Sequence, residues 1–301
     1  MTNVVFMGSP DFAVPTLRAL AAYYEVIGVV TQPDRESGRG RTIKSPPIKM
    51  LADELKLDLI QKKLRAPEAI NQLRLWNPDL IVVAAFGQIL KPDVLDLPPY
   101  GCINVHASLL PRWRGAAPIQ AAILAGDSQT GATIMKMDPG VDTGAIIRQR
   151  AIQISDDDTA GSLSERLSQL GADLLIETLP GYLSGLIKPQ PQDENQATYA
   201  PMLKKEHGLL DFTKSVEELA RRVRAFNLWP GAYMDFNGMM LKIHRAHVEM
   251  GMASEGQRLI YQSRPAVGAR GGLLILDEVQ PAGKRLMSGK AFLSGARNWE
   301  K

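Results

Sequence analysis

Apolar residues follow two patterns along the first two thirds of this chain. Short β-branched runs are typical of buried strands, and stretches with apolar positions three or four residues apart are typical of amphipathic helices. Their alternation predicts an α/β fold with a mostly parallel sheet. We expect strands at residues 4–7, 26–31, 58–60, 80–85, 102–106, 132–136 and 145–154, and helices beginning at Pro67, Pro118 and Asp158, the last ending at Pro180.

The pattern changes after residue 188. Residues 189–205 are polar and proline-rich without apolar periodicity, which is typical of a linker. Closely spaced short strands then predict a small barrel of the oligonucleotide-binding (OB) type. The expected organisation is a first domain of residues 1–188, the linker, and a second domain of residues 206–301, with a helix at 215–226 and strands at 231–236, 239–246, 258–261 and 272–276.

Composition indicates a soluble globular protein, because 45% of residues are hydrophobic and 22% are charged. No apolar run approaches the ~18 residues that cross a bilayer, and the N-terminus enters a strand directly, so we expect a cytoplasmic protein without membrane contact. The single cysteine, Cys102, excludes an internal disulfide and lies in apolar surroundings that predict a buried core position. The absence of a heptad pattern favours a monomer.

Charge is unevenly distributed. The net charge is +3, but residues 206–301 carry 14 basic and 10 acidic side chains, whereas residues 1–205 are close to neutral. The C-terminal part is therefore the better candidate to meet a polyanion. A solvated surface that merely has this sign is the alternative.

Candidate chemistry lies at the end of the expected strand 102–106. Asn104 and His106, two residues apart in an extended chain, point to the same face, at the edge where open α/β sheets bind ligands. Asp142, in the stiff loop 138–144, could face them and orient the imidazole, which would give a site suited to acyl transfer. The alternative is that both are polar residues that cap the strand. Dinucleotide binding is not expected, because only Gly8 of a GxGxxG pattern is present and Pro10 lacks an amide N–H.

Residues 104–115 (NVHASLLPRWRG) and 137–144 (MDPGVDTG) resemble the site of the folate-dependent formyltransferases. Four further stretches, GSPDFAVPTL, TQPDRESGRGR, ATYAPMLKKEHGLLDF and RVRAFNLWPGAY, are similar to the members that act on initiator tRNA. The resemblance implies a Rossmann-like formyltransferase domain followed by an OB-like tRNA-binding domain. It implies 10-formyltetrahydrofolate as the donor, the α-amino group of methionyl initiator tRNA as the acceptor, and no metal.

The resemblance also implies roles for individual residues. The Asn104 amide would donate to the oxygen of the tetrahedral intermediate, His106 would donate to that oxygen or relay the amine proton, and Asp142 would hold the imidazole. Cofactor contacts would come from the turn after the strand and from the end of the preceding strand: Ser108, Leu109, Leu110, Pro111, Val83 and Phe86.

The resemblance implies that the contacts that discriminate among tRNAs lie in the N-terminal domain. Residues 32–49 form an unusually long connection for a compact domain, which is typical of a functional loop. Arg112 and Arg114 would position the acceptor end, or would instead fold back onto the sheet. The expected tRNA-binding residues are Arg35, Arg39, Arg41, Lys44, Arg112 and Arg114, with Arg221, Arg222 and Arg224 as phosphate contacts in the second domain.

Two other functions remain open on the sequence. A formyltransferase acting on a small amine, such as a ribonucleotide or an amino sugar, would use the same three residues. A folate-binding or RNA-binding module without turnover is the alternative from another class.

Overall fold

A computed structural model describes residues 2–37, 42–296 and 298–300. The chain divides into two compact units. The first contains the chain up to Pro118, Gln129–Gln153 and Ser164–Ala200. The second contains Ile119–Ser128, Ile154–Leu163 and the chain from Pro201 onward.

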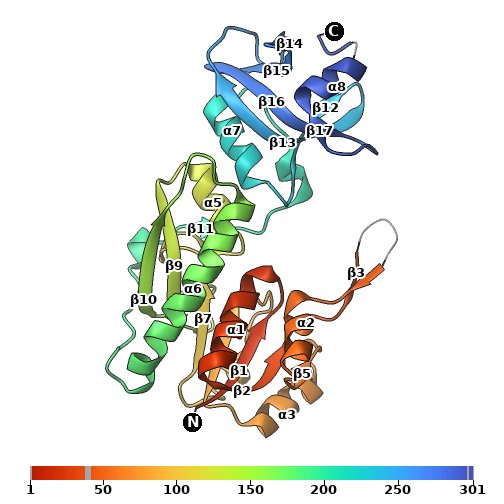
Figure 1. The fold of residues 1–301 in the computed structure, drawn as a ribbon. Coiled ribbons are helices and arrows are strands. Elements are labelled where there is room, and N and C mark those ends of the chain that lie inside the picture. The colour runs from red at the N-terminus through yellow and green to blue at the C-terminus, as the bar shows by residue number, and fades with distance from the viewer. Residues whose placement is uncertain (1, 38–41, 297, 301) are drawn as a thin grey trace. The chain divides into compact units, whose positions relative to one another are not determined.

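A seven-stranded sheet forms the centre of the first unit (Figure 1), in the order β10-β9-β7-β6-β1-β2-β5. The strands from β7 to β5 pair in parallel, while β9 and β10 are antiparallel. The expected α/β fold with a mostly parallel sheet is therefore confirmed. The strands are β1 (Asn3–Gly8), β2 (Glu25–Val30), β5 (Leu59–Ile60), β6 (Leu80–Ala84), β7 (Cys102–His106), β9 (Gln129–Lys136) and β10 (Ile146–Gln153).

Both faces of this sheet are covered, as the continuous apolar strands require. Along β1, Val4 and Phe6 belong to the core cluster that contains α1, α2 and α6, whereas Val5 and Met7 belong to the cluster that contains α3 and α4. The period of two in strand side chains produces this division. The helices of this part of the chain are η1 (Asp11–Ala13), α1 (Val14–Tyr23), α2 (Pro47–Glu54), α3 (Pro67–Trp76), α4 (Pro92–Leu95), α5 (Pro118–Ala125) and α6 (Ala160–Leu183). Nearly all of α5 and the first residues of α6 belong to the second unit.

Helix α6 passes through Pro180, where the sequence predicted its end. A proline removes its own backbone N–H, but its carbonyl can still accept a hydrogen bond. The Ser184 N–H donates to Pro180 O at 3.1 Å and extends the turn. The expected end of this helix was therefore wrong by about one turn.

Residues 189–200, here called the connecting segment, are structured rather than extended between domains. They belong to the first unit and contain η2 (Glu194–Gln196) and β11 (Tyr199–Ala200). β11 pairs in parallel with β8 (Arg114–Gly115). The polar composition that predicted a linker thus belongs to a segment whose backbone and side chains are bound to the residues that follow β7.

The second unit contains an antiparallel sheet in the order β12-β13-β16-β15-β14, with β17 paired to β16. Its core contains Phe236, Phe292 and Trp299, whose ring centroids lie 5.4–5.6 Å apart, and the apolar face of α7. The expected separate β domain is confirmed. Its elements are η3 (Lys205–Gly208), α7 (Val216–Ala225), β12 (Ala232–Phe236), β13 (Met239–Glu249), β14 (Arg258–Tyr261), β15 (Arg264–Ala269), β16 (Gly272–Pro281), β17 (Met287–Ser288) and α8 (Gly289–Gly295).

Candidate active site

Asn104 and His106 lie on β7, at the point where the sheet changes from parallel to antiparallel pairing. β7 pairs in parallel with β6, with Val83 opposite Asn104, and antiparallel with β9. Both side chains are buried, with 9% and 6% of their surface exposed. A buried amide and a buried imidazole need hydrogen-bond partners.

Asp142 supplies an oxygen to each of them. Asn104 Nδ2 donates to Asp142 Oδ1 at 3.4 Å, and His106 Nδ1 lies 3.6 Å from Asp142 Oδ2. The Gly115 N–H also donates to Asp142 Oδ2, at 2.8 Å. The structure therefore brings together all three residues that the sequence predicted to be catalytic. We call Asn104, His106 and Asp142 the Asn-His-Asp cluster.

The two ring nitrogens of His106 face different groups. Its Nε2 lies 3.0 Å from the backbone carbonyl oxygen of Trp113. A carbonyl can only accept, so Nε2 carries the proton of this hydrogen bond. Nδ1 is consequently the nitrogen that faces Asp142, at a distance longer than a direct hydrogen bond.

The turn after β7 is held by hydrogen bonds to neighbouring strands. Ser108 Oγ donates to Arg112 O at 2.6 Å, Thr133 Oγ1 donates to Ser108 O at 2.6 Å, and Gln149 Nε2 donates to Leu110 O at 2.8 Å. Ser108 and Leu110 are buried, so their side chains shape this turn; Leu109 and Pro111 are partly accessible. Sequence reasoning missed Thr133 and Gln149, since both lie on other strands and carry no motif.

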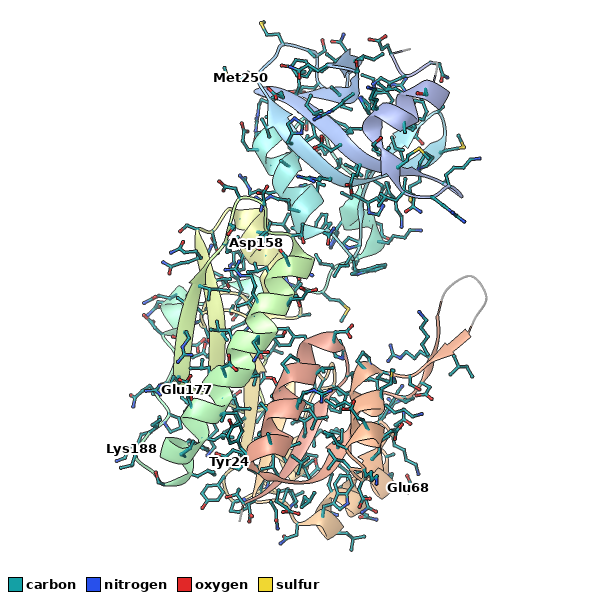
Figure 2. The ribbon with its side chains drawn as sticks, in the orientation of Figure 1. Tyr24, Glu68, Asp158, Glu177, Lys188 and Met250 are labelled. Carbon is teal, nitrogen blue, oxygen red and sulfur yellow. The ribbon has the colours of Figure 1, made fainter. Side chains whose placement is uncertain are left out.

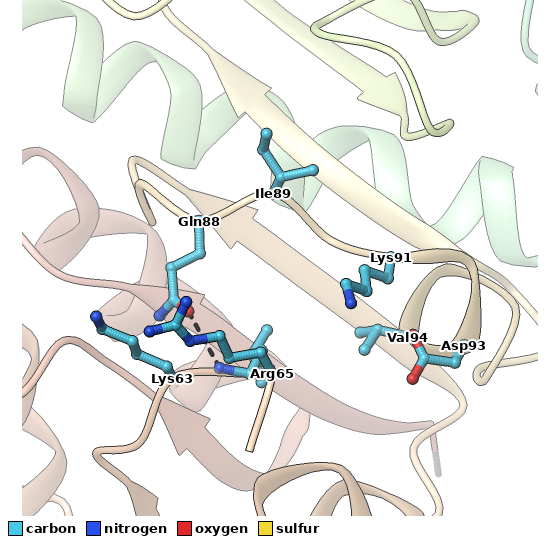
Figure 3. Close-up of a pocket in the computed structure, with 8 residues that line it drawn as sticks. Lys63, Arg65, Gln88, Ile89, Lys91, Asp93 and Val94 are labelled. Atoms are coloured by element: carbon cyan, nitrogen blue, oxygen red, sulfur yellow. Dashed lines mark hydrogen bonds between the residues drawn. The ribbon is translucent and has the colours of Figure 1, made fainter. Parts of the chain in front are cut away.

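A cavity of about 260 Å³ lies along the loop that follows β6 (Figure 3). Gln88 Oε1 accepts a hydrogen bond from the Leu64 N–H at 3.1 Å and joins the two segments that form its wall. Val83 and Phe86, expected to form the cofactor pocket, are buried in the core beside this loop and do not line the cavity. The lining combines apolar and basic side chains: Lys63, Leu64, Arg65, Gln88, Ile89, Lys91, Asp93 and Val94. None of the Asn-His-Asp cluster is among them.

The long connection 32–49 contains a two-stranded hairpin, β3 (Arg35–Ser37) and β4 (Thr42–Lys44) (Figure 1). Arg35 and Lys44 are paired across it and are both exposed. Arg39 and Arg41 lie outside the described residues. Arg35 and Lys44 are thus accessible to a polyanion, as the tRNA prediction requires.

Arg114 does not have the accessible position expected of a tRNA contact. It is fully buried and forms an ion pair with Glu194, with Nη2 and Oε1 2.7 Å apart. Hydrogen bonding to Glu194 raises the pKa of the Arg114 guanidinium and lowers the pKa of the Glu194 carboxyl. We therefore correct this prediction, because a fully buried guanidinium has no surface to offer a phosphate. Arg112 is exposed, with its guanidinium 4.3 Å from the centre of the Trp113 ring.

The arginines of α7 contact protein groups of the second unit. Arg221 Nε donates to Leu124 O at 3.2 Å. Arg224 Nη1 donates to the backbone carbonyl of Asp158 at 2.9 Å, a residue labelled in Figure 2. Burial lowers the pKa of Arg224. Arg222 pairs with Glu218. These contacts stabilise the unit, and the role of the three arginines as phosphate contacts stays a prediction.

Three further observations concern the described residues. Within the described part of the chain, no three His, Cys, Asp or Glu side chains are grouped so as to hold a metal ion. Burial raises the pKa of the Cys102 thiol to about 12, so this residue is an unreactive core side chain. Among the same residues, no helix combines the length and the hydrophobicity needed to span a bilayer.

Comparison with known proteins identifies relatives over nearly the whole chain. A family model described as formyl transferase matches residues 2–179, and one described as formyl transferase, C-terminal domain, matches residues 202–297. The methionyl-tRNA formyltransferase of Myxococcus xanthus is 47% identical over 97% of this chain and 95% of its own length. That of Bacillus pumilus is 48% identical over 98% of this chain and 95% of its own.

Solved structures show the same fold at lower identity. An N-formyltransferase from Helicobacter canadensis, in complex with folinic acid and dTDP-3-aminofucose, is 20% identical with a TM-score of 0.69, over 93% of this chain and 100% of its own. The methionyl-tRNA formyltransferase from Clostridium thermocellum is 18% identical with a TM-score of 0.59, over 83% of this chain and 94% of its own.

Fold and site together define a formyl transferase with an α/β domain and a separate β domain. At 47–48% identity over nearly its full length, the chain belongs to the methionyl-tRNA formyltransferase family.

Proposed function

We propose that this protein transfers the formyl group of 10-formyltetrahydrofolate to the α-amino group of methionyl initiator tRNA. The observation that carries the proposal is the convergence of the Asn-His-Asp cluster, at the sheet edge where α/β folds bind ligands, in a chain of this family. An enzyme with this acceptor works where translation starts, which favours the cytoplasm. We take a monomer as the working assembly.

In the reaction, the amine nitrogen bonds to the formyl carbon, the bond from that carbon to N10 of the folate breaks, and the amine proton ends on N10. The formyl oxygen gains negative charge in the tetrahedral intermediate. Asn104 directs one N–H toward Asp142, and among the described residues no partner takes its second N–H. We assign that second N–H to the developing oxyanion, where a fixed donor has its greatest effect.

His106 and Asp142 handle the proton. Since Nε2 donates to Trp113 O, Nδ1 and Asp142 Oδ2 form a pair of proton acceptors 3.6 Å apart. A proton taken from the attacking amine onto Nδ1 lies next to the carboxylate, which stabilises the imidazolium. The same proton then passes to the leaving N10.

The cavity along the loop after β6 supports a folate donor. A folate combines a flat aromatic part with an anionic glutamate tail. Leu64, Ile89 and Val94 can contact the former, and three cations in the same wall can contact carboxylates: Lys63, Arg65 and Lys91. The loop continues from β6, the strand next to β7, so donor binding and the Asn-His-Asp cluster belong to the same edge of the sheet.

An acceptor panel tests the function. Protein is incubated with 10-formyltetrahydrofolate labelled in the formyl group, together with methionyl initiator tRNA, methionyl elongator tRNA, an amino sugar nucleotide or an amino ribonucleotide. We expect label in methionyl initiator tRNA, with deacylated initiator tRNA as the blank. Transfer to a small amine instead, or binding of folate without transfer to any acceptor, would overturn the proposal.

The hairpin prediction is tested by salt dependence. Arg39→Ala or Arg41→Ala should lower kcat/KM for methionyl initiator tRNA and flatten the plot of its logarithm against the logarithm of salt concentration by about one unit for each lost phosphate contact. Arg18→Ala is the matched control, because Arg18 is an exposed arginine of α1 that pairs with Glu54. If the hairpin variants keep the wild-type slope, tRNA phosphates bind elsewhere.

A further inference from the structure

Gln192 of the connecting segment is tied to the loop that carries Asp142. Only 9% of its surface is exposed. Its Nε2 donates to two backbone carbonyls of this loop, Asp142 O at 2.8 Å and Gly144 O at 2.7 Å. Both amide hydrogens are therefore used on either side of Thr143. Glutamine is usually exposed, and a buried glutamine side chain is normally stabilised by hydrogen bonds such as these.

Arg114 holds Gln192 in this orientation. Arg114 Nε and Nη2 both donate to Gln192 Oε1, at 3.0 and 2.8 Å. These bonds fix which end of the amide is oxygen, because a guanidinium can only donate. Two further donors of Arg114 reach Glu194, at 2.8 Å for Nη1 and 2.7 Å for Nη2. The guanidinium buried beside the site is thus neutralised and fully oriented.

The loop needs such support because Asp142 has φ = 52°, in the left-handed region. For a residue other than glycine this conformation is unfavourable and persists only where surrounding contacts hold it. Gln192 holds the backbone, and the Gly115 N–H, next to Arg114 on β8, holds the carboxylate at 2.8 Å. Two contacts therefore clamp the residue that faces His106 and Asn104.

We propose that Gln192 is a positioning residue for formyl transfer: held by Arg114, it clamps the Asp142 backbone so that the carboxylate faces His106 and Asn104. The inference deepens the proposed function and rests on it. It gives the connecting segment a part in catalysis, although no residue of that segment belongs to the Asn-His-Asp cluster. Its effect falls on the chemical step and not on substrate binding.

The decisive variant is Gln192→Glu, which keeps the size of the side chain and an acceptor for Arg114 but removes both N–H donors. Single-turnover formylation at saturating folate and tRNA should fall on the order of 10- to 100-fold, since a displacement of about 1 Å in a catalytic group can cost that much. KM for both substrates should stay within about twofold of wild type. Gln192→Met, which removes all polar atoms, provides a second test if the first variant unfolds.

Gln196→Glu and Gln196→Met are the matched controls. Gln196 is exposed, lies in the same segment, and donates its side-chain hydrogen bond only to Asp193 among the described residues. Its variants should keep the wild-type rate. Thermal unfolding of all four variants separates a loss of rate from a loss of folded protein.

A double-mutant cycle distinguishes positioning from a merely structural role. If Gln192 acts through the Asp142 carboxylate, Gln192→Glu should cost less than about threefold in an Asp142→Asn background. An equal loss in both backgrounds, or a wild-type rate for Gln192→Glu, would overturn the inference.

Hydrogen exchange provides a test that does not depend on enzymatic activity. The amides of residues 138–144 should exchange faster in Gln192→Glu than in Gln196→Glu. Unchanged exchange would overturn the clamp even if activity fell. If wild-type protein transfers no formyl group, the proposed function fails, while faster exchange in this loop still supports the clamp.

Discussion

Replacing His106 with alanine is expected to slow single-turnover formylation of methionyl initiator tRNA by about 10²- to 10⁴-fold, the range of a lost general acid–base group. The physical reason is that Nδ1 is the ring nitrogen that faces Asp142, so its removal leaves the amine proton without an acceptor whose charged form is stabilised. Rapid-quench measurements with both substrates saturating report the chemical step directly.

His244→Ala is the control for this variant. His244 lies on β13 in the second unit and contacts Gln280, with its Nε2 3.2 Å from Oε1. The same substitution there should leave the rate within a factor of about two. A His106→Ala protein that is folded and reacts at nearly the wild-type rate would remove His106 from the mechanism.

Asn104→Ala should reduce the same rate by about 10²- to 10³-fold, the loss typical of one oxyanion donor. Asn104→Asp should be at least as slow, because it keeps the shape but replaces the N–H donors with an oxygen that faces the Asp142 carboxylate. The single-turnover rate should fall while KM for either substrate stays unchanged, because the donor acts on charge that appears only during the reaction.

Asn195→Ala is the control for Asn104→Ala, because it removes an asparagine amide outside the site. Asn195 is exposed in the connecting segment and its side chain donates to Asp193. It should react as wild type does. If Asn104→Asp kept full activity, the oxyanion would have to be stabilised by another group, such as a backbone N–H of the turn after β7.

The two units differ in how far the sequence predicted them. In the first, buried parallel strands read as continuous apolar runs, and every expected strand of the sheet is present. In the second, β15 was missed because its sequence, RPAVGA, contains a proline and a glycine that are unfavourable in strands. Its pairing with β14 and β16 outweighs that local preference.

The Asn-His-Asp cluster could be predicted for a related reason. Alternation along β7 places Asn104 and His106 on one face, and the carboxyl edge of a parallel sheet is the common location of a binding site. Local geometry and a general rule of topology were sufficient to place the two side chains together at this edge, and the resemblance to the formyltransferases implied their roles. The place of Asp142 opposite them required only that its loop return to the same edge.

The sequence was least informative for residues whose neighbours are distant in the chain. Arg114 looks like a surface cation beside a tryptophan, but its partners Gln192 and Glu194 come from the connecting segment, 78 and 80 residues later. The cavity likewise joins two separate stretches, residues 63–65 and 88–94. Composition described the connecting segment correctly as polar, yet it could not say that the polarity serves hydrogen bonds inside the first unit.

The sequence by itself determined the alternation of strands and helices, the sheet edge that bears Asn104 and His106, and the family to which their motif points. These follow from patterns a few residues long, because side-chain direction in a strand or helix depends on local backbone geometry. Only the tertiary structure decided that His106 donates from Nε2 to Trp113, that Arg114 is buried, and that Gln192 holds Asp142. Those outcomes depend on which distant segments the folded chain brings within hydrogen-bonding distance, and no local pattern encodes that.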